Sequence, residues 1–202
     1  MMERLRTQGI TNEDVLATMA RVPRHLFVDE AMATRAYEDA ALPIGEGQTI
    51  SQPMQVARMT EILINSGPMR RVLEVGTGSG YQAAVLGQLV DSVYTVERIH
   101  TLLQRARDRF RALGYTNILS RHTDGSWGWA SNSPYDGIIV TAAPTSVPES
   151  LLEQLGVGGT LIAPVGHQNG HQTLTVIRRT TSGYETEHRD SVRFVPFLSG
   201  KS

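Results

Sequence analysis

Hydrophobic residues in the first third of the chain recur at helical intervals. Thr11 opens a capping sequence, and the hydrophobic positions after it fall at i, i+1 and i+4, which predicts a helix that ends before Pro23. The same kind of spacing predicts two more short helices over residues 25–35 and 57–64. We therefore expect a helical extension, interrupted over residues 42–53 by a polar loop with two glycines and two prolines.

From Arg71 onward, short hydrophobic runs alternate with longer amphipathic runs, as in βα units that stack into a parallel sheet. The expected strands cover residues 71–75, 92–96, 117–121, 135–140 and 160–165, and the expected helices cover residues 81–90, 102–113 and 150–155. Two further strand-like runs, residues 171–178 and 192–197, are separated by a Thr181-Ser182-Gly183 turn, which predicts an antiparallel edge. The expected fold is α/β, a Rossmann-like doubly wound and mostly parallel sheet with an antiparallel C-terminal edge and an N-terminal helical extension.

The size and composition of the chain limit the number of domains and the classes of partner that we expect. At 202 residues it fits a single domain, with the extension and loop in residues 1–66 and the sheet-forming core in residues 67–202. Its net charge of −1 provides no positive field for nucleic acid or an anionic membrane, so neither is an expected partner. The absence of cysteine excludes disulfides and thiolate chemistry. Because no signal peptide or membrane-length apolar run is present, we expect a cytoplasmic protein.

A glycine-rich turn follows the first core strand. Gly76, Gly78 and Gly80 form a GxGxG sequence, in which glycine lets the backbone turn tightly and approach a ligand closely. The strand before it and the helix after it favour a nucleotide-binding turn over an ordinary tight turn. The dinucleotide sequence GxGxxG would have its third glycine at position 81, where this chain has Tyr81, so NAD fits poorly.

Acidic residues stand at the ends of the next two strands. Glu97 closes the second strand at the distance expected for a carboxylate that binds ribose hydroxyls, and Asp124 with Gly125 follows the third strand. Either acid alone could equally be a solvated strand end or part of a turn. Together with the glycine turn, and with no phosphate-binding lysine, they suit an adenosine without phosphates, such as S-adenosylmethionine.

This combination resembles the class I S-adenosylmethionine-dependent methyltransferases. The resemblance implies that the glycine turn lies beside the methionine portion of the cofactor, that Glu97 holds the ribose and that Asp124 faces the adenine. The cofactor-binding residues expected on this basis are Thr49, Glu74, Gly76, Thr77, Gly78, Gly80, Glu97, Asp124 and Gly125.

The residues after the fourth core strand bear on the methyl acceptor. Methyltransferases of base amino groups commonly carry an Asn/Asp-Pro-Pro-aromatic motif there, whereas this chain has Thr141-Ala142-Ala143-Pro144, so nucleobase amines are disfavoured. The six histidines show no convergent metal-ligand spacing, and no metal is expected. No buried general base is evident either. A carboxylate is already ionised at neutral pH and needs none, which favours a carboxyl acceptor.

The loop within the helical extension carries a closer resemblance. Residues Gln48 to Pro53 match, almost residue by residue, the substrate loop of the protein-L-isoaspartate O-methyltransferases. Further matches to that family are Val22-Pro23-Arg24, Phe27-Val28, Tyr37-Glu38-Asp39, residues 72–80, residues 136–144, Gly158-Gly159 and Arg193-Phe194-Val195-Pro196. One departure is Thr123, because the family usually has glycine before the aspartate.

The resemblance implies a reaction and a set of roles. A methyl group would pass from S-adenosylmethionine to the α-carboxylate of L-isoaspartyl residues in damaged proteins and peptides, leaving S-adenosylhomocysteine and initiating repair. Ser51 would be the catalytic residue near the methyl group and the substrate carboxylate, while Ile50 and Val195 would offer backbone groups to the peptide. From its position alone, Ser51 could instead cap the helix that begins after Pro53.

Two other functions remain open at the level of sequence. The same fold could methylate a carboxyl or hydroxyl group of a small molecule, although Ser51 in its loop argues against this. The glycine turn and the acids account only for cofactor binding, so a nonenzymatic adenosylmethionine-binding module is a further alternative. We expect a monomer whose partners are isoaspartyl-containing proteins and peptides.

Overall fold

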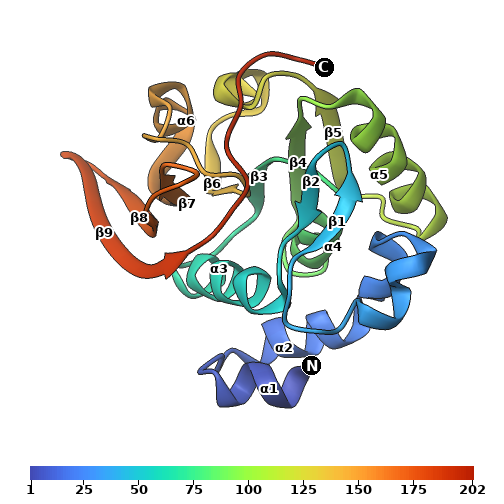
Figure 1. The fold of residues 1–202 in the computed structure, drawn as a ribbon. Coiled ribbons are helices and arrows are strands. Elements are labelled where there is room, and N and C mark those ends of the chain that lie inside the picture. The colour runs from blue at the N-terminus through green and yellow to red at the C-terminus, as the bar shows by residue number, and fades with distance from the viewer.

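A computed structural model describes residues 1–202, and its centre is a seven-stranded sheet in the order β5-β4-β3-β6-β7-β8-β9 (Figure 1). The strands are β3 (Arg71–Val75), β4 (Ser92–Glu97), β5 (Ile118–His122), β6 (Tyr135–Val140), β7 (Leu155–Gly166), β8 (Gln172–Thr180) and β9 (Gly183–Val192). Strands β3 to β7 are parallel, while β8 and β9 are antiparallel. The predicted fold class is confirmed. The order of the strands reverses between β3 and β6, which is where doubly wound sheets bind ligands.

Helices cover both faces of the sheet because its strands are hydrophobic on both faces. In β3, Val72 packs into one core cluster and Leu73 into another. The first cluster is covered by α3 (Pro53–Asn65), α4 (Tyr81–Leu86) and α5 (His100–Ala112), and the second by α6 (Glu149–Glu153) with residues near η3 (Gly125–Trp127) and η4 (Ala130–Asn132). The short loops that leave the strands at their carboxyl ends are consequently held from two sides.

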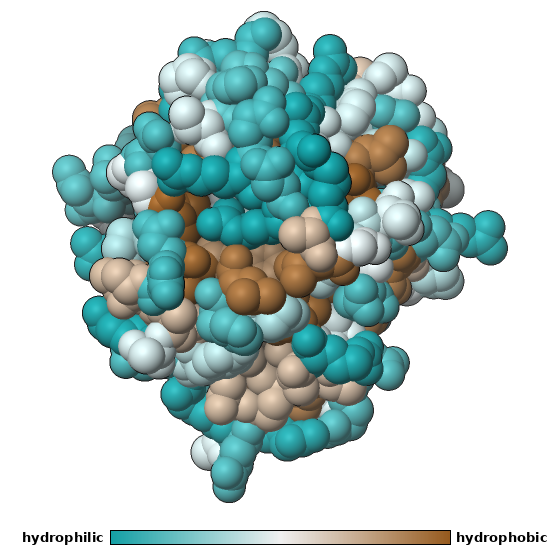
Figure 2. Space-filling model, turned by 90° about the vertical axis from the view of Figure 1, so that its right-hand side faces the viewer, coloured by the Kyte–Doolittle hydropathy of each residue, from teal (hydrophilic) through white to brown (hydrophobic).

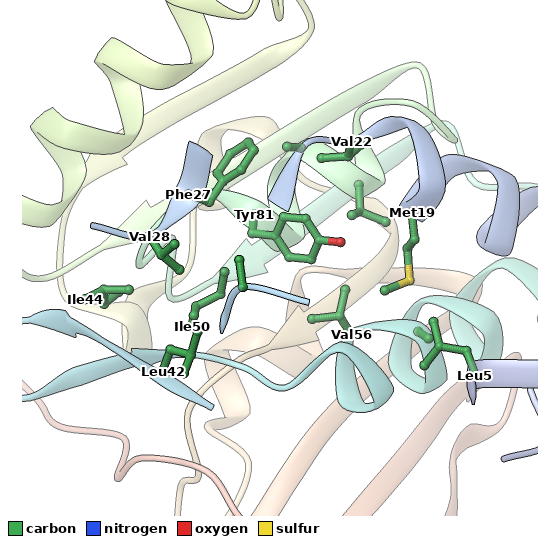
Figure 3. Close-up of a cluster of buried hydrophobic side chains, with 14 of the residues drawn as sticks. Leu5, Met19, Val22, Phe27, Val28, Leu42, Ile44, Ile50, Val56 and Tyr81 are labelled. Carbon is green, nitrogen blue, oxygen red and sulfur yellow. The ribbon is translucent and has the colours of Figure 1, made fainter. Parts of the chain in front are cut away.

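The N-terminal extension packs against α3 and α4 through a third hydrophobic cluster. It comprises α1 (Met2–Thr7), α2 (Glu13–Arg21), η1 (Arg24–Phe27), η2 (Glu30–Arg35) and a hairpin of β1 (Leu42–Gly45) and β2 (Gln48–Ile50). Figure 3 shows Tyr81 of α4 in the middle of this cluster, between Phe27 and Val56. The extension thereby fixes the hairpin relative to the glycine turn that precedes α4.

Several expected elements differ from the observed ones. The side chain of Asn12, not Thr11, caps α2 by accepting from the Val15 amide at 3.1 Å. Residues 25–35 do not form one helix, because two 3₁₀ turns separated by an extended Val28 occupy them. The polar loop contains the β1–β2 hairpin, which the sequence pattern did not predict.

The C-terminal edge also differs from the prediction. The last strand, β9, begins at Gly183 of the Thr181-Ser182-Gly183 turn, and residues 192–197 are not a strand of this sheet apart from the terminal Val192. Beyond β9 the chain instead crosses the carboxyl ends of the parallel strands (Figure 1), bonded to the loop after β6 through Ala143. The prediction failed because the 192–197 run is hydrophobic for a different reason, namely that it packs over the end of the sheet.

The surface of the molecule is mostly hydrophilic on the face that Figure 2 presents, with hydrophobic residues in a band across its middle. No helix is both long enough and apolar enough to span a lipid bilayer.

Candidate active site

A pocket of about 830 Å³ opens at the carboxyl ends of β3 and β4. Its floor is the glycine turn after β3, and one wall is the end of β4 at Glu97. The β1–β2 hairpin closes a second wall, and the segment of residues 195–198 closes a third. The pocket is therefore assembled from several stretches of chain that are far apart in the sequence.

The glycine turn is shaped by contacts that exclude side chains. The Gly76 amide donates to the Val96 carbonyl at 2.9 Å, which ties the turn to β4. Gly76 has φ +103°, and a Cβ there would collide with the hydroxyl of Thr141. That hydroxyl donates to the Gly76 carbonyl at 2.7 Å, so Thr141 holds the turn from the β6 side.

Glu97 faces the turn from the end of β4. Its carboxylate accepts from the Gly78 amide at 2.9 Å with one oxygen and from the Ile99 amide at 2.9 Å with the other. The side chain is almost fully buried yet lines the pocket. Two backbone donors orient the carboxylate and leave further acceptor positions on both oxygens for a ligand.

Glu74 is the most deeply buried carboxyl group of the site. One oxygen accepts from the hydroxyl of Thr95, which is itself 2.6 Å from the Thr77 hydroxyl, and the other has no hydrogen-bond partner. Burial raises the pKa of Glu74 to about 8, and the nearby Glu97 adds to the rise while the Thr95 hydrogen bond opposes it. Glu74 is consequently a neutral acid at pH 7 in the cofactor-free protein. Since the other oxygen accepts from Thr95, the unpaired oxygen can carry the proton and donate a hydrogen bond to an acceptor that enters the pocket.

The carboxylate of Asp124 accepts hydrogen bonds from its own loop and from the C-terminal segment of the chain. The Ser126 amide and hydroxyl both donate to one of its oxygens at 2.8 Å, and the Gly200 amide donates to the other. Burial alone would raise the pKa of Asp124, but these hydrogen bonds and the charge of Arg98 outweigh it and hold the pKa below its ordinary value. Asp124 does not line the pocket itself, although the adjacent Gly125 does.

Ser51 stands at the junction between the hairpin and α3. The cap residue of α3 is Gln52, and no side chain makes a capping hydrogen bond there, so the idea that Ser51 caps this helix is wrong. The Ser51 side chain is left free to line the pocket.

Arg24 fixes the main chain at Ser51. Its guanidinium is fully buried and donates to the Ser51 carbonyl and to the Ala36 carbonyl, each at 2.7 Å. It also lies over the Tyr81 ring, 4.7 Å from the centroid. Burial lowers the pKa of Arg24, and the neighbouring Tyr81 opposes that shift. Arg24 thereby connects η1, the hairpin and α4 behind the pocket.

Most residues expected at the site come together in the pocket. Those that line it are Thr49, Ile50, Ser51, Glu74, Gly76, Thr77, Gly78, Glu97, Gly125 and Val195. Gly80 does not: a Cβ there would lie 2.7 Å from the Phe110 ring, so this glycine permits close packing of the turn against α5.

Sequence reasoning missed several lining residues. Tyr81 and Gln82 of α4 and Thr141 after β6 all border the pocket. Tyr81 and Gln82 occupy ordinary helix positions, and no local sequence pattern identifies them as pocket residues. Thr141 could have been found, since it follows a buried strand at the sheet edge that carries the other candidates.

Comparisons with known proteins agree with this geometry. The whole chain, residues 1–202, matches the sequence model of the family described as protein-L-isoaspartate(D-aspartate) O-methyltransferase. The chain belongs to this family. It is 58% identical over 201 residues to the protein-L-isoaspartate O-methyltransferase of Halorhodospira halophila, covering 100% of this chain and 91% of that protein. It is 54% identical over 200 residues to the one of Pseudomonas aeruginosa strain LESB58, covering 99% and 94%.

Solved structures of the isoaspartate methyltransferase family share the fold. One structure named protein-L-isoaspartate O-methyltransferase superposes with a TM-score of 0.87 at 28% identity, over 97% of this chain and 65% of that chain. A structure described as a putative family member from Plasmodium falciparum, in complex with S-adenosyl-L-homocysteine, gives a TM-score of 0.84 at 26% identity over 98% and 96%. Enzymes of this family depend on S-adenosylmethionine, and the pocket at the carboxyl ends of β3 and β4 offers matching groups in Glu74, Glu97 and the glycine turn.

Proposed function

We propose that the protein methylates the α-carboxylate of L-isoaspartyl residues in damaged proteins and peptides, with S-adenosylmethionine as the methyl donor. The observation that carries this proposal is that Ser51, directly after the hairpin, borders the same cavity as the glycine turn and Glu97. The donor side and the acceptor side of a methyl transfer therefore meet in one space.

On the donor side, Glu97 would hold the ribose hydroxyls with the acceptor positions that its two backbone contacts leave open. Thr77, Gly78 and the unpaired oxygen of Glu74 would face the methionine portion. Gly125 would lie against the adenine, and Asp124 would act there by keeping its loop in place.

On the acceptor side, the Ser51 hydroxyl would donate a hydrogen bond to the substrate carboxylate without becoming a nucleophile. Ile50 and Val195 both line the pocket and would offer main-chain groups to the peptide. The Val195 amide is free for this purpose, because no hydrogen bond within the chain uses it.

The cofactor supplies a methyl group on a positively charged sulfur, and the substrate supplies an ionised carboxylate. The chain would contribute orientation, because Ser51 and the main-chain groups of Ile50 and Val195 would position the substrate carboxylate beside the cofactor. Bound cofactor and peptide would displace water from the pocket, and opposite charges attract more strongly in a medium of lower dielectric constant. No proton has to be removed from an ionised carboxylate, so the reaction needs no general base.

The proposal is tested with labelled S-adenosylmethionine and two peptides that differ only in an L-isoaspartyl or a normal aspartyl residue. We expect base-labile methyl incorporation into the isoaspartyl peptide alone. Incorporation into small carboxylic acids but into neither peptide would assign the protein to a different substrate class. Cofactor binding without turnover on any carboxylate would leave a nonenzymatic binding module.

We further propose that the protein works as a cytoplasmic monomer. The support for a monomer is that one chain supplies every lining residue of the pocket described above. The absence of cysteine is in keeping with a compartment in which disulfides do not form. Light scattering with size-exclusion chromatography measures the first point, and cell fractionation measures the second.

A further inference from the structure

Gln82 is a buried polar side chain that lines the active-site pocket. It occupies the second position of α4, directly after Tyr81, and its exposed fraction is only 8%. Its amide nitrogen donates a hydrogen bond to the hydroxyl of Thr60 in α3 at 3.0 Å. Because Thr60 is fully buried, this hydrogen bond joins α4 to α3 behind the pocket wall and fixes the direction of the Gln82 amide.

The carbonyl oxygen of the Gln82 amide has no hydrogen-bond partner within the chain. The only hydrogen bond of this side chain uses the nitrogen, and the oxygen is not sealed inside the protein, so the open space beside it is the pocket. An amide oxygen that is almost buried destabilises a protein unless a donor reaches it. In a binding pocket, we expect that donor to come from the ligand.

Gln82 lies away from the residues that would contact the ribose and the adenine. Glu97 ends β4 and Gly125 follows β5, and these two strands form one end of the sheet. Gln82 instead contacts α3, which packs over β6 on the other side of β3, with Leu63 against Gly137 (Figure 1). A cofactor with its ribose at Glu97 and its adenine at Gly125 would therefore extend its remaining portion toward α3 and Gln82.

We propose that Gln82 binds the amino-acid end of S-adenosylmethionine by accepting a hydrogen bond from its ammonium group, and that Thr60 positions the amide for this contact. The inference rests on the proposed function, which sets the direction in which the cofactor lies. An ammonium group has donors and no acceptor, so it needs oxygen atoms such as the free one of Gln82. A hydrogen bond from a charged donor is also stronger than one between neutral groups.

This contact would place the reactive sulfur between two fixed points. Glu97 would hold the ribose on one side of the sulfur, and Gln82 would hold the ammonium group on the other. Val56, one helical turn before Thr60 in α3, also lines the pocket, and Ser51 comes just before α3, so Gln82 lies toward the acceptor side. Fixing both ends of the cofactor would orient the methyl group toward that side.

The contact would also make the pocket selective for the intact cofactor. Adenosine derivatives that keep the sulfur but lack the amino-acid end would make the same contacts with Glu97 and Gly125. The groups that hold the adenosine therefore cannot distinguish such derivatives from the cofactor. A buried acceptor that is left unpaired by the shorter ligand can do so, because its lost hydrogen bond is not replaced.

The test measures, by calorimetry on the full-length protein, the Kd of four ligands. They are S-adenosylhomocysteine, its analogue without the amino group, its analogue without the carboxyl group, and 5′-methylthioadenosine, which lacks both. We expect Gln82→Met to weaken the two ligands that carry the ammonium group by about tenfold or more, and to leave the Kd of the other two unchanged. Gln88→Met, an exposed glutamine just after α4, is the matched control and should change none of the four.

The pattern across the ligands separates a contact from a structural role. An equal loss of affinity for all four ligands in Gln82→Met would show that Gln82 only supports the pocket wall, and would overturn the contact. A loss confined to the two ligands that carry the carboxylate would overturn the assignment to the ammonium group. Unchanged affinity for every ligand would overturn the proposal as well.

Thr60 provides a second variant, which also serves if Gln82→Met does not fold. Thr60→Val keeps the shape of the side chain but removes the hydroxyl, so the Gln82 amide stays and is no longer fixed. We expect the same pattern across the ligands with a smaller loss, of about three- to tenfold, while Thr60→Ser should bind like the wild type. Wild-type affinities in Thr60→Val would overturn the positioning role of Thr60.

These binding measurements use no methyl acceptor, so they are independent of the peptide test of the proposed function. The expected pattern across the four ligands, together with no methylation of an isoaspartyl peptide, would reject the proposed function and retain the Gln82 contact. Methylation of the peptide without the pattern would do the reverse.

Discussion

At the scale of single residues, Ser51 is the side chain on which the acceptor side depends. It borders the pocket without capping α3, and Arg24 holds its carbonyl at 2.7 Å, so its position does not depend on its own hydroxyl. We expect Ser51→Ala to lower kcat on an isoaspartyl peptide by roughly ten- to a hundredfold, since a hydrogen bond to a charged group contributes about 1.5–3 kcal/mol.

The same variant should leave the affinity for S-adenosylhomocysteine nearly unchanged, as measured by calorimetry. Ser182→Ala, in the turn between β8 and β9, is a matched control that should affect neither quantity. A parallel loss of cofactor affinity and thermal stability in Ser51→Ala would show that the serine supports the hairpin instead of the reaction.

Glu74 gives a prediction about pH. Its pKa rises from 4.5 to about 8 on burial, so the folded protein holds a proton that the unfolded chain releases above pH 4.5. Folding stability contributed by this group is present below pH 4.5 and is lost progressively as the pH rises toward 8. Relative to Glu74→Gln, which cannot ionise, the cofactor-free wild type should lose stability between pH 5 and pH 8.5. Thermal unfolding at several pH values measures this, and equal slopes for the two proteins would contradict the protonated state.

At the scale of elements, the glycine turn is held between β4 and α5. Gly80 has φ +90°, and an added Cβ would lie 2.7 Å from the Phe110 ring. Gly114 has φ +76° with nothing within 4 Å of such a Cβ, so it isolates the cost of backbone strain. We expect Gly114→Ala to lower the free energy of unfolding by about 1–2 kcal/mol. Gly80→Ala should cost about 1–3 kcal/mol more, because it adds the steric clash.

Chemical denaturation of the two glycine variants measures this difference. Equal destabilisation would mean that the turn can move away from α5, and that the packing of Gly80 does not define the pocket floor. Cofactor titration of Gly80→Ala adds a second readout, since a displaced turn should weaken binding even though Gly80 does not line the pocket.

At the scale of the whole molecule, the cofactor pocket joins the N-terminal extension, the sheet and the C-terminal segment. A ligand that binds there binds only the folded protein, so it should stabilise all three together. At 100 times its Kd, S-adenosylhomocysteine should add about 2.7 kcal/mol and raise Tm by roughly 5–10 °C in a chain of this size. Differential scanning calorimetry should show one transition that shifts as a unit. A shift confined to part of the transition would place the extension outside the cooperative unit.

The division into residues 1–66 and 67–202 remains a prediction within this picture. The side chain of Tyr81, from the core, is surrounded by hydrophobic residues of the extension, including Phe27 at a ring-centroid distance of 5.5 Å (Figure 3). The calorimetric experiment above is also a test of whether the two parts unfold as a single domain.

The parallel strands, the glycine turn and Glu97 can be predicted from local patterns in the sequence. Alternating hydrophobic and amphipathic runs predict the parallel strands, because burying both faces of a sheet requires hydrophobic residues whatever the details of packing. The glycine turn and Glu97 can be predicted for a related reason. A backbone that approaches a ligand closely needs glycine, and a strand end that binds hydroxyl groups needs an acceptor. The resemblance of residues 48–53 to a known loop supplied the rest of the functional prediction.

What remained hidden from the sequence depends on contacts between distant segments. Arg24 stabilises the end of the β1–β2 hairpin by donating to the carbonyl of Ser51, which lies 27 residues later in the chain. No local sequence pattern predicts that this arginine is buried. Gly80 and Asp124 are predicted ligand contacts, and the sequence does not show that Gly80 packs against Phe110 or that Asp124 accepts from the Gly200 amide. The hydrophobic run at 192–197 resembles a strand because burial over the end of a sheet demands the same residues as burial within it. By itself, the sequence determined which segments must be buried and which turn must approach a ligand; only the tertiary structure decided which segments meet, because the partners of a buried group are set by packing across the whole chain.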